Sequence, residues 1–263
     1  MRNVLTKLAV AAAALVGGVT SANAYVILTI TDLSTATTTI CNTSLACGAG
    51  WTIINSNTVS FTGTIGAFDV VATQGFGNTP GTPAVAFANT TSLSVNRNDG
   101  AAGLKGLKVT FDAIDFSAPI GQFKSLQGSA SDTAGAGFFT AGSDFVASQF
   151  YVDSAGGTLF NSPATAPPGS TAADGLYNTG CFFFVSTNGS CAAPGITWAD
   201  PSAPVGTFSA RSEQQFALNA ASIVQTTSSL TIRTVPEPMT TTLVGMALVG
   251  LAFASRRSAA KKA

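Results

Sequence analysis

The chain has 263 residues, of which 46% are hydrophobic, 9% are charged and none is histidine. The absence of histidine excludes Ser-His-Asp and Cys-His nucleophile systems and removes the commonest metal ligand. Twelve basic residues balance twelve acidic ones over the whole chain, but residues 25–234 hold six basic against eleven acidic side chains, a net charge near −5. This balance argues against nucleic-acid binding, because phosphates require basic clusters.

Residues 1–24 have the features of a secretory signal peptide. Two basic residues charge the start, a short apolar core follows, and Ala22 and Ala24 form an A-x-A cleavage site. The apolar core is about half as long as a membrane-spanning helix requires. We therefore expect an N-terminal signal helix, and a mature chain that begins at Tyr25.

Residues 25–234 have the pattern of a single all-β domain. Short alternating runs rich in Thr, Val and Phe recur between clusters of Gly, Asn, Pro and Ser, and no stretch keeps a 3.6-residue apolar period. The candidate strands are Tyr25–Thr31, Gly50–Ile54, Val59–Gly63, Phe68–Thr73, Ser92–Val95, Leu107–Phe116, Phe145–Val152, Cys181–Ser186, Gly206–Leu218 and Ile223–Val235. Strands with one apolar and one polar face predict an antiparallel β-sandwich, Ig-like or jelly-roll-like.

The last two candidate strands show this alternation most clearly. The apolar positions are Val224, Leu230 and Ile232 in the last strand, and Phe208, Ala210, Phe216 and Leu218 in the strand before it. The polar positions of the earlier strand, Arg211, Glu213 and Gln215, are expected on a solvated face. Because Asn219-Ala220-Ala221 joins the two strands, we expect a hairpin.

Irregularities are expected at three places. The apolar alternation of Leu107–Phe116 changes parity near Ala113, which predicts a β-bulge. Gly- and Pro-rich composition predicts long loops at Gly75–Ala84 and Asn161–Gly180, and the second is either a solvated connector or a binding lid.

The four cysteines form two pairs of sequence neighbours, Cys41 with Cys47 and Cys181 with Cys191. In an exported chain they should be oxidised, and three connectivities are open. Local pairing is favoured because sequence neighbours meet first, and it would close loops that contribute roughly 2.4 and 2.8 kcal/mol on the chain-entropy estimate. Thiol catalysis is not favoured, since no histidine is available to activate a thiolate.

Other chemistry would depend on carboxylates, calcium or aromatic rings. Carboxylate hydrolysis would use Glu213 or the pairs Asp112/Asp115 and Asp144/Asp153, for which solvated side chains are the simpler interpretation. Calcium suits the oxygens of Asn96–Gly100, although that stretch lacks EF-hand spacing and its composition is also typical of a turn. The rings of Trp51, Trp198, Tyr151 and Tyr177 would suit a sugar-stacking platform or the core. We expect no catalytic residues and no cofactor, with calcium as the alternative.

The C-terminal segment 235–263 begins with Val235 and the triplet Pro236-Glu237-Pro238. A short apolar run, Leu243–Ala254, follows and ends at Arg256-Arg257 and two lysines. The run is shorter than the roughly 20 residues of a spanning helix, so it predicts a short hydrophobic helix that anchors weakly. The basic cluster predicts a cytoplasmic C-terminus, and the prolines predict an exposed hinge.

This order of triplet, apolar run and basic cluster resembles the PEP-CTERM sorting tail of exported bacterial proteins. The resemblance covers about thirty residues. It implies recognition by an exosortase-like membrane transpeptidase that cuts near Pro236-Glu237-Pro238, in bacteria that build extracellular polysaccharide. An ordinary transmembrane helix after a proline linker is the alternative.

Together these features predict three parts: a signal peptide (1–24), an exported all-β domain (25–234) and a sorting tail (235–263). We expect a non-enzymatic protein of the periplasm, cell surface or extracellular matrix, held at least transiently at the inner membrane by its tail and associated with exopolysaccharide or biofilm. A carbohydrate- or calcium-binding module and a carboxylate hydrolase are the alternatives.

Overall fold

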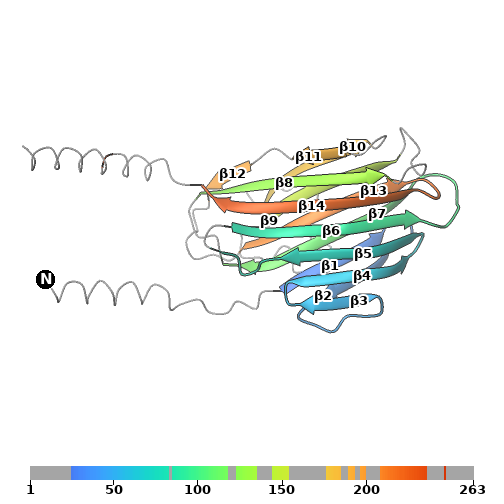
Figure 1. Cartoon of the computed structure of the whole chain (residues 1–263), viewed down its shortest axis with the longest axis horizontal. Helices are drawn as coiled ribbons and strands as arrows, with labels where there is room; N and C mark the ends of the chain where they lie inside the picture. Colours follow the sequence, from blue (N-terminus) through green and yellow to red (C-terminus); the bar gives the residue numbers. More distant parts are fainter. Residues whose placement is uncertain are drawn as a thin grey trace, which may run out of the picture.

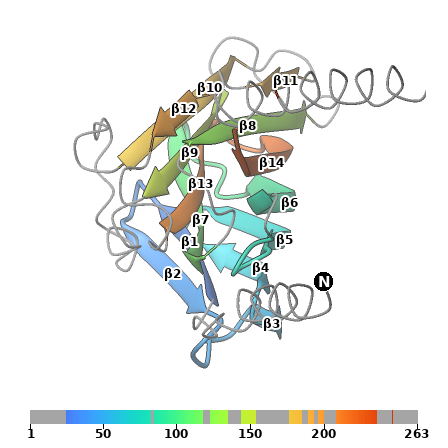
Figure 2. The same ribbon diagram turned by 90° about the vertical axis from the view of Figure 1, so that its left-hand side faces the viewer.

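The computed structural model describes residues 25–82, 85–117, 123–134, 144–153, 176–184, 189–192, 196–199, 208–235 and Met246. These residues form two antiparallel sheets of six and eight strands that pack face to face (Figures 1 and 2). The expected all-β antiparallel sandwich is thereby confirmed.

Each sheet is described by its strands in spatial order. The six-stranded sheet contains β10 (Leu176–Phe184), β9 (Phe145–Asp153), β13 (Phe208–Leu218), β7 (Lys105–Phe116), β1 (Tyr25–Asp32) and β2 (Thr37–Asn42). The eight-stranded sheet contains β11 (Gly189–Ala192), β8 (Phe123–Ala134), β14 (Ile223–Thr234), β6 (Val85–Arg97), β5 (Phe68–Gly77), β4 (Thr58–Ile65) and β3 (Trp51–Asn55), and β12 (Ile196–Ala199) pairs with β8. The edge strands β2 and β3 lie on the same side of the sandwich (Figure 1).

The core lies between the sheets and is built by the inward positions of alternating strands. Its largest fully buried apolar side chains are Phe68, Phe111, Phe116, Phe150, Phe208 and Phe216. Phe116 and Phe208 stack with ring centroids 5.2 Å apart. The expected apolar face of β14 is confirmed, since Val224, Leu230 and Ile232 are all fully buried.

The predicted bulge in β7 is confirmed. Phe208 pairs with Phe116 but Ala210 pairs with Ala113, so β7 contains one residue more than β13 over this interval. Asp115 lies in this bulge and has a positive φ of 63°. The extra residue places Ile114 on the outer side of the sheet, while Phe116 returns to the core.

The predicted hairpin between the last two strands is wrong. β13 pairs with β7 and β9 in one sheet, whereas β14 pairs with β6 and β8 in the other. The connection therefore crosses between the two sheets. Amphipathic alternation fits both arrangements, because it specifies the face of a strand and not its neighbours.

Two buried side chains hold this crossover. The Asp144 carboxylate accepts from Asn219 N at 2.7 Å, from Asn219 Nδ2 at 2.8 Å and from Ser222 Oγ at 2.8 Å. The Arg97 guanidinium donates to Leu218 O at 2.8 Å and also to carbonyl oxygens of the β6–β7 loop. Two buried polar side chains that are distant in sequence thus stabilise the connection by hydrogen bonds.

Several strand boundaries differ from the expectation. β2, β8, β11 and β12 were not expected. β6 begins earlier, directly after the predicted loop Gly75–Ala84, and β5 enters that loop as far as Gly77. Gly75 lies within β5 at a position where a Cβ would come 2.3 Å from Cδ2 of Phe111, so this close approach requires a glycine. Of the second predicted loop, the last residues belong to β10 and the remainder lies outside the described residues.

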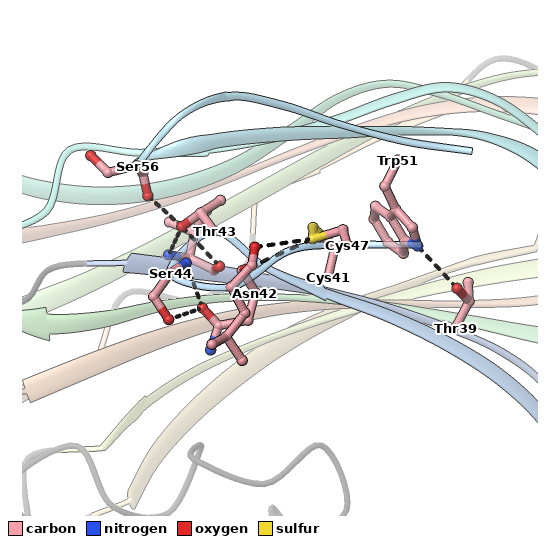
Figure 3. The surroundings of a disulfide bond; sticks show 10 residues. Thr39, Cys41, Asn42, Thr43, Ser44, Cys47, Trp51 and Ser56 are labelled. Atoms are coloured by element: carbon pink, nitrogen blue, oxygen red, sulfur yellow. Dashed lines mark hydrogen bonds between the residues drawn. A yellow bond between two sulfur atoms is a disulfide. The ribbon is translucent and has the colours of Figure 1, made fainter. Parts of the chain in front are cut away.

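The local disulfide Cys41–Cys47 is confirmed, with its Cα atoms 5.1 Å apart. It closes the turn after β2, where the Asn42 carboxamide accepts from Ser44 N and Oγ (Figure 3). The backbone places Cys181 in β10 and Cys191 in β11, which belong to different sheets. Their side chains lie outside the described part, so the second pairing stays a prediction.

Other expectations also fall outside the described residues. They concern the signal peptide with Ala22 and Ala24, and the tail with Pro236-Glu237-Pro238, Arg256 and Arg257. Tyr25 is the first residue of β1, and Val235 directly follows β14. Over the described ranges, no helix has both the length and the apolarity to cross a membrane.

Candidate functional site

The outer face of the six-stranded sheet carries a cluster of polar side chains. Strand registers place its side chains in rows that cross β9, β13, β7 and β1. One row contains Tyr151, Arg211, Asp112 and Ile27; the next contains Gln149, Glu213, Thr110 and Thr29; the third contains Ala147, Gln215, Lys108 and Thr31. We call these three rows the polar strip.

A buried ion pair lies in the first row of the polar strip. Arg211 donates from Nε to Asp112 Oδ1 at 2.5 Å and from Nη2 to Oδ2 at 2.9 Å, and the two residues are 2% and 0% exposed. Burial raises the pKa of Asp112 above its ordinary value, and the Arg211 guanidinium opposes that rise. The bidentate geometry fixes the orientation of the guanidinium against the carboxyl group.

Buried groups of the polar strip hold half-buried ones at its surface. The Tyr151 hydroxyl donates to Gln149 Oε1. Gln215 Nε2 donates to Glu213 Oε1 at 2.7 Å, and Lys108 Nζ lies 3.9 Å from Glu213 Oε2. Gln149, Gln215 and Lys108 are therefore oriented side chains that retain further donor capacity.

An apolar and aromatic patch adjoins the polar strip. Tyr25 packs against the buried cluster of Ile27, Ile114 and Tyr151. Burial, with a further contribution from the charge of Glu213, raises the pKa of Tyr151 to about 12, so this phenol is neutral and can donate. The buried hydroxyl Thr29 Oγ1 on this face has no hydrogen-bond partner among the described residues.

The structure corrects the expectation of a solvated face on β13. Glu213 is 7% exposed, and Arg211 is buried in the ion pair described above. The suggested carboxylate pairs also do not form. Asp144 and Asp153 lie at opposite ends of β9, where Asp144 binds the crossover.

Asp112 and Asp115 are likewise not partners in the geometry, since both oxygens of Asp112 accept from Arg211. Sequence reasoning missed the pairing of Asp112 with Arg211, which are 99 residues apart. One signal was present: Asp112 interrupts an otherwise apolar run between Phe111 and Ala113.

The backbone distributes the four proposed platform aromatics over four strands of the two sheets. The Trp51 indole donates to Thr39 Oγ1 at 3.0 Å and packs on Phe61 at a centroid distance of 4.7 Å, so it closes the β2/β3 side of the sandwich (Figure 3). The backbone places Trp198 in β12 of the eight-stranded sheet and Tyr177 in β10 of the other. Of the four, Tyr151 belongs to the polar strip.

The proposed calcium segment Asn96–Gly100 forms protein–protein contacts. The Asp99 carboxylate binds Lys105 Nζ and accepts from Arg97 Nε at 2.9 Å. Asn98 Nδ2 donates to Asp69. Within the described ranges, His, Cys, Asp and Glu side chains nowhere gather in a group of three or more that would suit a metal.

These contacts predict a pH dependence of stability. The hydrogen bond from Lys105 holds the pKa of Asp99 down to about 2, below its ordinary 3.8. A depressed pKa contributes stability above the unfolded value, and that stability is lost as pH falls from about 4 to about 2. Asp99→Asn should therefore unfold more easily in urea than wild type at neutral pH, and the gap should close near pH 2. A gap of constant size across this range would contradict the assignment.

No protein-family model and no curated protein matches this chain. Among solved structures, it is similar to carbohydrate-binding modules of the β-sandwich superfamily, at 12% identity and a TM-score of 0.25, covering 80% of this chain and 72% of the other. It is also similar to a family 11 carbohydrate-binding module from Clostridium thermocellum, at 9% identity and a TM-score of 0.24, covering 79% and 96% of the two chains.

A third similarity is to an isomalto-dextranase from Arthrobacter globiformis T6, at 12% identity and a TM-score of 0.26. The match covers 77% of this chain but only 29% of that enzyme. At these identities and TM-scores the similarities say nothing about the function of this chain.

Proposed function

We propose that this chain is an exported, non-enzymatic surface protein whose β domain binds extracellular polysaccharide through the polar strip. The observation that carries the proposal is that buried side chains of the polar strip bind and orient the accessible ones. Buried Tyr151 and Glu213 orient Gln149, Gln215 and Lys108, which remain accessible at the surface of the face. Side chains held in place before binding lose less conformational entropy when a ligand arrives.

The chemistry of this face fits a neutral sugar. Carboxamides, hydroxyls and an ammonium group offer donors and acceptors to sugar hydroxyls, and the half-buried ring of Tyr25, which packs against buried Ile27 and Ile114, offers an aromatic surface for the carbon face of a sugar ring. The net charge near −5 of residues 25–234 disfavours an anionic polymer.

Hydrolysis is the alternative that the same face raises. Asp112 and Glu213 occupy diagonal positions on β7 and β13, so the same face carries two carboxyl groups, the pair that glycosidases use. Binding is favoured because Asp112 is fully buried and both of its oxygens accept from Arg211. Neither oxygen is free to transfer a proton to a leaving group.

A glycan array probed with the exported chain tests the binding proposal. We expect retention on neutral polysaccharides and no retention on anionic ones. Binding confined to anionic glycans, or no binding to any glycan, would contradict the proposal. Release of reducing ends by wild type but not by Glu213→Gln would establish hydrolysis instead.

The sorting route is a second part of the proposal and depends on the tail alone. Replacing Pro236-Glu237-Pro238 with alanines should leave the protein membrane-bound and uncut, because the apolar run survives and the recognised hinge is lost. Deleting 243–263 should release the intact domain, because nothing then retains it. Mass spectrometry of cell-associated protein measures both outcomes. Wild-type protein that keeps Arg256-Arg257 at steady state would favour the plain transmembrane anchor.

A further inference from the structure

The edge strand β2 is an open hydrogen-bonding edge of the six-stranded sheet. β2 pairs with β1 on one side, and no described residue pairs with its other side (Figures 1 and 2). Its register with β1 runs without a shift from Thr37 to Asn42. An unbulged edge of this kind is a template for a further strand.

The hydrogen-bond alternation identifies the outward backbone groups. Thr43 N donates to Val26 O at 3.0 Å, directly across the register, which makes this a hydrogen-bonded pair. In an antiparallel ladder such pairs alternate, so Thr37, Thr39 and Cys41 bond to β1. The N–H and C=O groups of Thr38 and Ile40 and the N–H of Asn42 consequently point away from the sheet, and the Asn42 carbonyl accepts from Leu45 N at 2.9 Å in the turn after β2.

The devices that usually protect an edge are missing along β2. The sequence from Leu33 to Phe68 contains no charged residue and no proline, although residues 25–234 have a net charge near −5. Natural edge strands are commonly blunted by lysine, proline or a bulge. Ile40 is 41% exposed at the centre of the strand. Two copies of this acidic domain would therefore meet with little repulsion at the β2/β3 side, and of these two edge strands β2 is the one whose register has no shift.

The edge is also held rigid from its inner side. The Cys41–Cys47 disulfide ties the end of β2 to the following turn, and Trp51 donates to Thr39 (Figure 3). A strand that is already ordered pays little entropy when it pairs.

We propose that β2 is the docking site for β2 of a second copy of this chain, paired antiparallel about a two-fold axis at Ile40. Outward groups then face outward groups: Ile40 pairs with Ile40 of the second copy, and Thr38 pairs with Asn42. This is the isologous arrangement in which one patch complements itself. The interface does not depend on the proposed glycan binding, but it would continue the rows of the polar strip from one sheet into the next, since Ile40 lies opposite Thr29.

Sedimentation of the exported full chain tests this pairing. We expect a concentration-dependent dimer in wild type. Ile40→Lys places a charge on the edge, and Ile40→Pro removes an outward donor while the bonds of Thr39 and Cys41 to β1 remain. Each should raise the dimer dissociation constant at least about tenfold, since it removes a paired hydrogen bond or buries a charge. Leu45→Lys, which adds the same charge at an exposed position outside the strand, should leave the dimer intact.

Cysteine cross-linking tests the register, read by peptide mapping. At a hydrogen-bonded pair the Cα atoms lie about 5.5 Å apart, within the about 4.4–6.8 Å range of a disulfide. Ile40→Cys should therefore cross-link two copies, whereas Thr38→Cys should not, because its copies would be about 13 Å apart. A monomeric wild type, a dimer unaffected by Ile40→Lys, or cross-linking at Thr38→Cys in place of Ile40→Cys would overturn the proposal.

Discussion

Arg211→Ala is expected to lower the free energy of unfolding by about 3–5 kcal/mol. The substitution leaves the fully buried carboxylate of Asp112 without the bidentate partner that now accounts for both of its oxygens. Denaturant unfolding of the two proteins measures the loss. Because burial already raises the pKa of Asp112, the variant should also be relatively more stable at acid pH, where that carboxyl is protonated.

A matched control distinguishes this loss from the general effect of removing an arginine. Arg233→Ala removes an exposed guanidinium from β14 and should change the free energy of unfolding by less than about 0.5 kcal/mol. Replacing both partners, as Asp112→Leu with Arg211→Met, should recover much of the stability, because no unpaired charge then remains. Equal losses in Arg211→Ala and Arg233→Ala would contradict the buried ion pair.

Phe150→Ala should cost about 3–5 kcal/mol of stability, because the ring is fully buried between the sheets. The ring also explains the glycine on the facing strand. A Cβ at Gly128 would lie 2.1 Å from Cδ2 of Phe150, so this ring fills the position of the missing side chain. Denaturant unfolding of Phe150→Ala checks the magnitude.

The same contact predicts coupling between the two positions. Gly128→Ala alone should cost about 1–3 kcal/mol through overpacking, whereas in a Phe150→Leu background the added methyl should cost less. Gly48→Ala is the matched control, because a Cβ there meets no atom within 4 Å. Additive losses in the double variant would show that the ring and the glycine do not share this space.

Strands with strong alternation could be predicted from the sequence, and those with small inward residues could not. The faces of β14 and the bulge of β7 followed from apolar positions such as Val224 and Phe111. β8 was missed because Gly128 and Ala130 occupy its inward positions, so apolar periodicity is nearly absent there. The ring of Phe150 on the other sheet fills the space that a side chain of Gly128 would take, and no local sequence pattern shows this contact.

Pairing between distant strands was the second obstacle. The crossover after β13 depends on Asp144 and Arg97, which hold it by side-chain hydrogen bonds across 75 and 121 residues. The local sequence Asn219-Ala220-Ala221 does not indicate these distant partners. The same reason explains the site: Arg211 and Glu213 alternate like solvated residues, and only the pairing of β13 with β7 and β9 shows their burial.

The central claim, that glycan binds to the polar strip, is tested most directly by two matched glutamine variants. Gln149 lies half-buried in the strip on β9, whereas Gln127 is exposed on β8 on the outer face of the opposite sheet. Calorimetric titration with the glycan that binds best should show affinity reduced about two- to tenfold in Gln149→Ala, the loss of one hydrogen bond, and unchanged in Gln127→Ala. Weaker binding in Gln127→Ala with full affinity in Gln149→Ala would contradict the account.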